Sequence, residues 1–174
     1  MKRTIFVLLM IGFISLLSAQ FLKFADWYEY PESVIGYMTG FGYELGDEYE
    51  NSEGELVLYF SDIEINALDD DVYDVSNLYF VFDEDERLYY GKMVLAYSFK
   101  PGRDDDILEE TVIDLADLIS YVYEDEYEDY DYEVESAYDF YVYWETPTTE
   151  ILFTPFADSV YHGYYGLRIE FQRK

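Results

Sequence analysis

The chain has 174 residues, of which 39 are Asp or Glu and 10 are Lys or Arg, and its formal net charge is −29 at pH 7. It contains no Cys and a single His, which excludes disulfide frameworks, Cys-ligated metals and thiol catalysis. Hydrophobic residues make up 51% of the chain and aromatic residues 21%, so the sequence predicts a folded acidic domain and not a disordered one. Such a negative charge repels phosphate backbones and anionic lipid, which excludes nucleic acid and membrane surfaces as partners.

The first residues have the layout of a secretory signal peptide. Lys2 and Arg3 precede an uncharged apolar run over 5–17, and small residues follow at 18–19. The run is shorter than the roughly 20 apolar residues that a membrane span needs. We therefore expect residues 1–19 to be removed, and the mature protein to be exported to a periplasm or the extracellular space without insertion into the membrane.

The first half of the mature chain predicts one helix followed by strands. Pro31 and Gly40 bracket apolar residues at helical spacing, which indicates a short helix over 31–39. The glycine-rich stretch 40–46 is interpreted as a helix stop and turn. Alternating apolar residues then predict strands over 56–60, 78–82 and 88–99, with a slip in phase after the first and a polar hairpin turn before the last.

The second half repeats this order. An amphipathic helix is predicted over 106–123, because Asp106 can cap it and apolar residues recur at steps of three and four. The following segment, 124–135, holds eight carboxylates and no base, which indicates a mobile acidic linker. Strands are then expected over 138–145, 151–153 and 165–171, with turns at 146–149 and 155–158.

The two halves of the chain are similar in layout. The tripeptide Tyr-Tyr-Gly enters one alternating strand at 89–91 and another at 164–166, and the two helix starts have the same offset. This predicts an α+β fold of two tandem helix-then-antiparallel-sheet units, 20–103 and 104–174, which form one sheet with helices on one face. Chance similarity between two Tyr-rich strands is the alternative interpretation.

This layout resembles the β-lactamase inhibitory protein fold and the outer-membrane assembly lipoproteins that share it, over residues 30–171. The chain lacks the lipid-attached Cys of the lipoproteins and the disulfides of the inhibitory proteins, so no functional residue is carried over from either group. The resemblance implies a secreted or periplasmic protein that binds other proteins through its sheet.

The sequence offers no specific catalytic motif. His162 is the single His, and no Ser stands in the context of a nucleophile elbow. The pair Gly91-Lys92 lacks the upstream glycine of a phosphate-binding loop. Among so many carboxylates, some pair will reach the separation used by glycosidases by chance, so the pattern singles out none. We therefore predict a protein that is not an enzyme and needs no cofactor.

Acidic loops are the candidates for a calcium site, because Ca²⁺ takes oxygen ligands from flexible loops. None of the acidic clusters has the spacing of an EF-hand, and solvated turns are the simpler interpretation. The candidate ligands are Asp69, Asp70, Asp71 and Asp74. A calcium-dependent protein of the cell envelope is the first alternative function.

The distribution of tyrosines is the most informative feature. If the more apolar phase of each strand faces the helices, the opposite phase still carries rings and aliphatic groups, whereas a solvated sheet face normally alternates to charge. Tyrosine offers a broad, rigid ring with a hydroxyl at its tip, which suits recognition. The candidate binding residues are Tyr59, Tyr79, Tyr141, Tyr143, Tyr164 and Arg168.

These observations predict an exported binding protein whose Tyr-rich sheet face meets a protein partner that is basic or has an apolar patch. A carbohydrate-binding module is a further alternative, since the same rings can stack on sugars. The competing structural interpretation is that segment 21–30, the acidic loops or a second copy of the chain covers this face.

Overall fold

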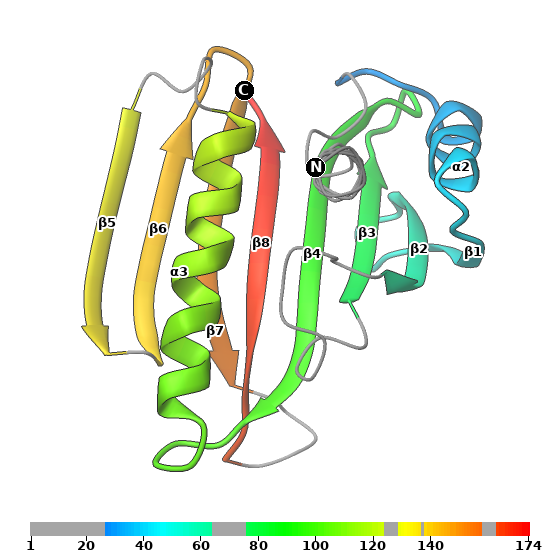
Figure 1. Ribbon diagram of the computed structural model, residues 1–174. Helices are drawn as coiled ribbons and strands as arrows, with labels where there is room; N and C mark the ends of the chain where they lie inside the picture. Colours follow the sequence, from blue (N-terminus) through cyan, green and yellow to red (C-terminus); the bar gives the residue numbers. More distant parts are fainter. Residues whose placement is uncertain (1–26, 64–75, 124–128, 137, 158–162) are drawn as a thin grey trace, which may run out of the picture.

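The computed structural model describes residues 27–63, 76–123, 129–136, 138–157 and 163–174 (Figure 1). The predicted signal peptide and the candidate calcium ligands Asp69, Asp70, Asp71 and Asp74 lie outside the described residues. No helix of the described part of the chain is long and apolar enough to cross a membrane.

The described residues form two helices and one antiparallel sheet. The helices are α2 (Pro31–Gly40) and α3 (Asp105–Val122). The strands are β1 (Leu45–Glu50), β2 (Leu56–Ile63), β3 (Ser76–Phe82), β4 (Leu88–Phe99), β5 (Asp129–Ser136), β6 (Asp139–Glu145), β7 (Thr149–Ala157) and β8 (Tyr165–Arg173). All eight belong to one sheet in the order β1-β2-β3-β4-β8-β7-β6-β5.

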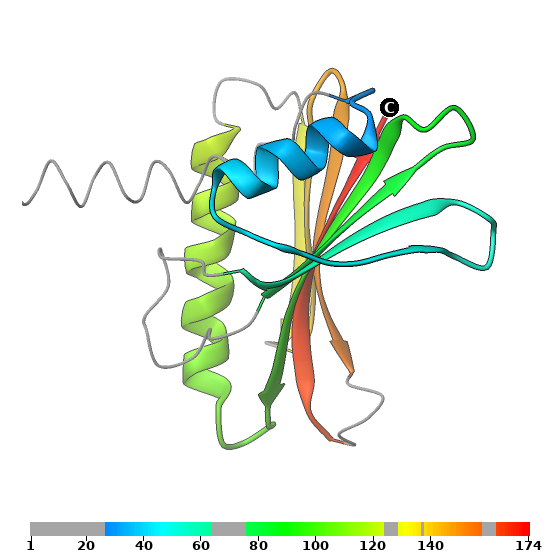
Figure 2. The ribbon, with the colours of Figure 1, turned by 90° about the vertical axis from the view of Figure 1, so that its right-hand side faces the viewer.

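Both helices pack against the same face of this sheet. Figure 2 shows α3 lying along one side of the sheet, and the apolar stripe of α3 buries Leu108, Leu115 and Ile119. The shorter α2 buries Val34 and Met38 in the same hydrophobic cluster. Each side chain of this size stabilises the fold by about 1.5–3 kcal/mol when it is fully buried. One core under two helices therefore holds the sheet together.

The expectation of two tandem helix-plus-sheet units is wrong. Most of the described residues belong to a single antiparallel sheet of eight strands, which does not divide into two units, because β4 and β8 pair directly at its centre, with Lys92 opposite Glu170 and Leu95 opposite Leu167. The core cluster also mixes side chains from both halves. The two Tyr-rich strands that suggested a repeat are therefore neighbours at the centre of the sheet. Local alternation shows that a segment is a strand, but it carries no information on which strand pairs with it.

Most of the helix and strand predictions are confirmed. The helices begin and end within a residue of the predicted bounds, and the polar turn 83–87 joins β3 to β4. The predicted slip in phase corresponds to a register shift between Phe60 and Ile63 in the β2–β3 pair. The phase assigned to the core is largely buried, although Leu56 is only half-buried.

Three stretches differ from the predictions. Residues 45–50, for which no strand is predicted, form the edge strand β1, and residues 129–135 of the predicted linker form most of the opposite edge strand β5. The strand β7 also continues through Pro155, where a turn was expected. Because β6 pairs with β7 only as far as Phe153, the later part of β7 has one free edge among the described residues, and a free edge tolerates proline.

Candidate functional site: the open face of the sheet

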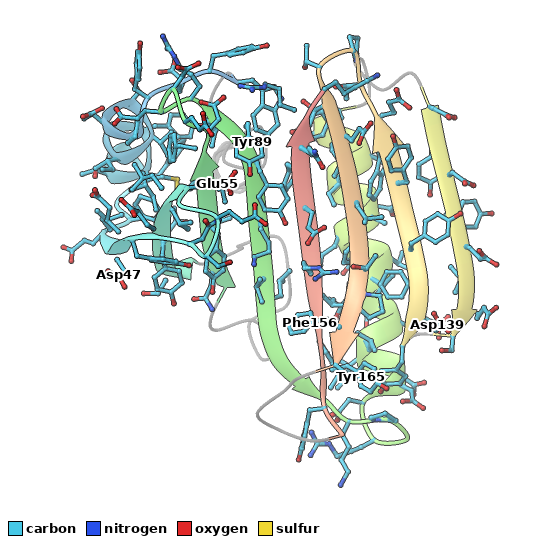
Figure 3. The ribbon with its side chains drawn as sticks, turned by 180° about the vertical axis from the view of Figure 1, so that it is seen from behind. Asp47, Glu55, Tyr89, Asp139, Phe156 and Tyr165 are labelled. Atoms are coloured by element: carbon cyan, nitrogen blue, oxygen red, sulfur yellow. The ribbon has the colours of Figure 1, made fainter. Side chains whose placement is uncertain are left out.

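The candidate site is the face of the sheet opposite the helices, which we call the open face (Figure 3). Neither described helix crosses it. The described part of the N-terminal segment lies at one end of the sheet instead, because the indole of Trp27 donates to Thr149 Oγ1 at 2.6 Å. The next residue, Tyr28, donates its N–H to the carbonyl of Leu88. Residues 27–30 therefore do not cover the open face.

Cross-strand pairing arranges part of the open face as a row that spans all eight strands. Aromatic rings flank the middle of this row, and charged groups occupy its middle and its two ends. From β5 to β1 the row contains Asp131, Tyr143, Leu152, Glu170, Lys92, Tyr79, Tyr59 and Asp47. Such a row is the unit through which side chains of adjacent strands contact each other on one face.

The middle of the open face contains two cations and one carboxylate. Glu170 lies opposite Lys92, and its Oε1 is 3.1 Å from Nε of Arg168. Arg168 also donates from Nη2 to Thr154 Oγ1 at 3.5 Å. Burial lowers the pKa of Lys92, although Glu170 acts in the opposite direction. The centre of the open face is therefore cationic in a strongly acidic protein.

On the β2–β3 side of the centre, two tyrosine rings form an apolar platform. The centroids of Tyr59 and Tyr79 are 5.1 Å apart, and Lys92 Nζ lies 4.5 Å from the centroid of Tyr79 in a cation–π contact. The hydroxyl of Tyr59 donates to Asn77 Oδ1 at 2.9 Å. Burial, followed by the neighbouring Tyr59, raises the pKa of Tyr79. These contacts hold both rings in place on the open face.

On the opposite side of the centre, tyrosine hydroxyls donate to carboxylates. Tyr141 donates to Asp131 Oδ2 at 3.0 Å, and Tyr143 donates to Glu145 Oε2 at 3.2 Å. Burial, followed by the charge of the nearby Glu150, raises the pKa of Tyr143 to about 12. Because this chain has few basic side chains, tyrosine hydroxyls supply hydrogen-bond donors that its carboxylates would otherwise lack.

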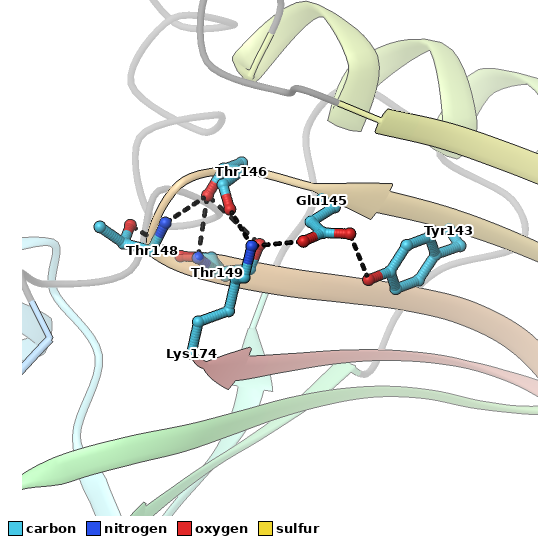
Figure 4. Close-up of polar contacts among 6 residues, drawn as sticks. All are labelled: Tyr143, Glu145, Thr146, Thr148, Thr149 and Lys174. Atoms are coloured by element: carbon cyan, nitrogen blue, oxygen red, sulfur yellow. Dashed lines mark hydrogen bonds and ion pairs between the residues drawn. The ribbon is translucent and has the colours of Figure 1, made fainter.

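The position of Tyr143 is supported by the turn between β6 and β7 (Figure 4). Glu145, which accepts from Tyr143, also forms an ion pair with Lys174, and that cation lowers the pKa of Glu145. Lys174 Nζ donates in addition to the carbonyl of Thr146 at 3.3 Å. The buried Thr146 closes the turn, because its Oγ1 accepts the N–H of Thr149 at 2.9 Å. The C-terminal residue is thus tied to the open face through Glu145.

The structure brings most of the predicted site residues onto the open face, but not all. Tyr141 and Arg168 lie beside the row described above, on strands that the row crosses. Tyr164 lies apart from them, before the start of β8, where the guanidinium carbon of Arg103 is 6.0 Å from its ring centroid. It therefore belongs to the end of the sheet near the start of α3.

Sequence reasoning missed the charged centre of the face. Lys92 and Glu170 lie in the same strand phase as the predicted Tyr and Arg residues, so the alternation of 88–99 and 165–171 was the signal that marked them. Tyr90 follows the same alternation, and burial, followed by the charge of Glu170, raises its pKa. A charged residue in the middle of a strand is normally interpreted as a solvent-exposed position. Its role in a binding face becomes visible only when the aromatic residues on the same face of the sheet are considered with it.

Metal coordination finds no support in the part of the chain that the structure describes. No group of three or more His, Cys, Asp or Glu side chains there is arranged to hold a metal ion. The calcium hypothesis therefore stays with Asp69, Asp70, Asp71 and Asp74, on which the described residues have no bearing.

Comparison of the chain with protein-family models, with curated proteins and with solved structures found no match. The resemblance to the β-lactamase inhibitory protein fold therefore stays a prediction. What the open face does must follow from its own residues.

Proposed function

We propose that this chain is an exported, non-enzymatic binding protein that docks a protein partner on the open face of its sheet. The observation that carries the proposal is the row across all eight strands, in which tyrosine rings flank the Lys92–Glu170 centre. A sheet face that only meets solvent has no need for this number of rings. Rings of this kind, around a polar centre, are typical of protein recognition surfaces.

The charges of the open face define the partner that it fits. Both ends of the row are acidic, at Asp47 and Asp131, and Asp131 belongs to the exposed edge strand β5, which carries further carboxylates. A partner with basic residues at its rim would match these ends and would be attracted from a distance. At the centre, Lys92 and Arg168 favour an apolar or hydrogen-bond-accepting surface over a further cation.

The hydrogen bonds of the tyrosines favour a protein over a sugar as ligand. The hydroxyls of Tyr141 and Tyr143 already donate to Asp131 and Glu145, so the donors and carboxylates that would meet sugar hydroxyls are paired with each other. The same bonds fix the rings before binding. Fixed rings lower the entropic cost of forming an interface.

The test is affinity capture with three forms of the purified mature protein. The first is unaltered, the second carries Tyr79→Ser and Tyr143→Ser on the open face, and the third carries Ile107→Ser and Tyr121→Ser on α3. Ile107 is 44% exposed and Tyr121 57% exposed, so the third form controls for general loss of apolar surface. Proteins retained from the native cell-envelope fraction are identified, purified and titrated against each form.

We expect a retained protein to bind the unaltered and the α3-altered forms with the same dissociation constant. The open-face form should lose about tenfold in affinity or more, which corresponds to about 1.4 kcal/mol. Its thermal unfolding should stay cooperative, because the altered rings are half-buried and not part of the core. Equal retention by all three forms would contradict the proposal.

Export is tested separately, by sequencing the N-terminus of the protein recovered from its native cells. A mature chain that begins close to residue 20 supports removal of the predicted signal peptide. A protein that keeps residues 1–19 and stays inside the cell would contradict this part of the proposal, without bearing on the open face.

A further inference from the structure

The edge strand β5 (Asp129–Ser136) has two chemically different sides. Among the described residues it pairs only with β6, and all of its residues are exposed. On the helix side it presents three apolar or aromatic residues, which pair with the inward residues of β6 and are 44–61% exposed: Tyr130, Tyr132 and Val134. On the open-face side it presents only carboxylates: Asp129, Asp131, Glu133 and Glu135.

The backbone donors on the free edge of β5 are held by the strand's own carboxylates. The N–H of Tyr130 donates to Asp129 Oδ1, and the N–H of Tyr132 donates to Asp131 Oδ1, both at 2.9 Å. In an antiparallel strand, alternate residues direct their backbone groups to opposite neighbours. Tyr130, Tyr132 and Val134 therefore present their N–H and C=O groups to the free edge, where an added strand would pair.

The apolar side of β5 continues toward α3. The ring of Tyr130 lies 5.7 Å from that of Trp144 on β6, and the Trp144 indole donates to Ser120 of α3 at 3.0 Å. Ile113 lies two helical turns before Ser120, so it is on the same flank of α3, and its side chain is 53% exposed. An added strand would thus find exposed apolar groups on its helix side.

We propose that the free edge of β5 accepts an added strand from a partner segment in which Lys or Arg alternates with apolar residues. The partner's carbonyls would take the N–H groups of Tyr130 and Tyr132. This would release the carboxylates of Asp129 and Asp131, which then meet the partner's cations on the open-face side. Main-chain pairing would provide affinity, and the alternation of charge and apolar groups would provide register. The inference rests on β5 and does not require the open face to bind anything.

Charge excludes two other pairings. A second copy added through β5 would place the same row of carboxylates against its own, and like charges on neighbouring strands are destabilising. The opposite edge strand, β1, has acidic side chains on both sides, at Asp47 and at Glu48, so it lacks an apolar side for a partner. Of the two edge strands in the described part of the chain, β5 alone combines an acidic side with an apolar side.

The experiment is a titration of the full mature protein with a fluorescent peptide of alternating lysine and valine, as long as β5. A second peptide of the same sequence carries N-methyl groups on alternate amides, which prevents strand pairing but keeps charge and composition. The protein variant carries Asp131→Asn and Glu133→Gln, which keep the side-chain shapes. A matched control carries Asp47→Asn and Glu48→Gln on β1, with the same change in charge.

We expect the β5 variant to bind the first peptide about tenfold more weakly than the unaltered protein, whereas the β1 control changes it little. The N-methylated peptide should bind the unaltered protein at least as weakly as the first peptide binds the β5 variant. Hydrogen exchange at the amides of Tyr130 and Tyr132 should slow when the first peptide is bound. Three results would each overturn the proposal: no binding, equal binding of both peptides, or equal losses in the two variants. A failure of the affinity-capture test of the open face would not contradict the proposal for β5.

Discussion

Asp83 shows how single carboxylates of this acidic chain build local structure. Its Oδ1 accepts the N–H groups of Asp85 and Arg87 at 3.1 and 2.9 Å, and its Oδ2 accepts from Arg173 Nη2 at 3.1 Å. Burial alone would raise the pKa of Asp83, but the Arg87 N–H and the Arg173 guanidinium outweigh it, and the pKa is lowered. The carboxylate thus closes the β3–β4 turn and ties it to the last strand.

Replacing this carboxylate should destabilise the protein in a pH-dependent way. We expect Asp83→Ala to lower the free energy of unfolding at pH 7 by about 1–3 kcal/mol, as for the loss of charge-assisted hydrogen bonds. Because the pKa of Asp83 is lower in the folded than in the unfolded state, its ionised carboxylate stabilises the folded protein at pH values above the unfolded pKa of about 3.9. This stabilisation is lost as the pH falls through the folded-state pKa. Urea denaturation should show that the difference from the unaltered protein narrows in acid; a difference that stays constant would contradict this role.

Tyr143 gives the opposite dependence on pH. Its pKa is raised to about 12, so the folded protein keeps this proton in a range where the unfolded chain, with a tyrosine pKa of about 10, loses it. The resulting stabilisation is complete below pH of about 10 and is lost as the pH rises toward 12. Tyr143→Phe should therefore show a shallower fall in stability in alkali, and the tyrosinate absorbance difference between the two proteins should appear near pH 12. An absorbance step near pH 10 would refute the assignment.

The edge strands show a feature of whole elements. In β1 the N–H of Glu48 donates to Asp47 Oδ1 at 2.8 Å, and β5 repeats this contact at Asp129 and Asp131. Charged side chains that cover unpaired donors are a known protection against edge-to-edge association. Carboxylates therefore protect both described edges of the sheet against edge-to-edge association, although only β5 of the two has an apolar side.

The pairing of β7 with β8 depends on a glycine under an aromatic ring. Gly166 lies opposite Phe156, and a Cβ at Gly166 would come within 2.6 Å of the Phe156 ring and 3.0 Å of the Leu95 carbonyl. We expect Gly166→Ala to destabilise the protein by about 1–3 kcal/mol, as other overpacked sites do.

A double-mutant cycle tests this contact directly. Phe156→Ala removes the ring, so Gly166→Ala should cost less in that background, while the backbone contact to Leu95 keeps part of the cost. The measurement is urea denaturation of the four proteins. Strictly additive costs would show that the ring does not exclude a side chain at Gly166.

The sequence predicts the helices and strands that have one buried and one exposed side, and it misses the strands that are exposed on both sides. The helices and the central strands have one apolar phase, so their periodicity marks them, as at 78–82 and 106–123. β1 and β5 are almost wholly exposed, so no alternation of buried and exposed residues marks them as strands. They are extended because they pair with the neighbouring strands β2 and β6. The order of strands was also beyond prediction, because register and neighbours are long-range properties.

For the whole molecule, the net charge of −29 opposes folding, because the charges of the compact state repel each other. Salt screens repulsion between exposed charges over about 8 Å at physiological ionic strength. We expect the thermal midpoint to rise with NaCl and to level off above about 0.5 M, where the screening length is only a few ångströms. A midpoint that falls with salt would mean that ion pairs such as Asp83–Arg173 outweigh the repulsion. CaCl₂ at matched ionic strength should add nothing further, and a clear additional rise would favour the calcium hypothesis.

The candidate face could be predicted only in part. Strand alternation marked Tyr59, Tyr79 and Tyr143 as sharing one face, and the structure places them in one row. Alternation could not show that Lys92 and Glu170 stand between them, because that depends on β4 pairing with β8. The chemistry of the face is thus set by the order of strands, which no local pattern contains.

The most direct test of the central claim is hydroxyl-radical footprinting of the mature protein, first alone and then with its captured partner. If the open face is a docking surface, Tyr59, Tyr79 and Tyr143 oxidise readily in the free protein and are protected in the complex, while Tyr121 on α3 reacts equally in both. Rings that are already unreactive in the free protein, or protection confined to α3, would contradict the claim.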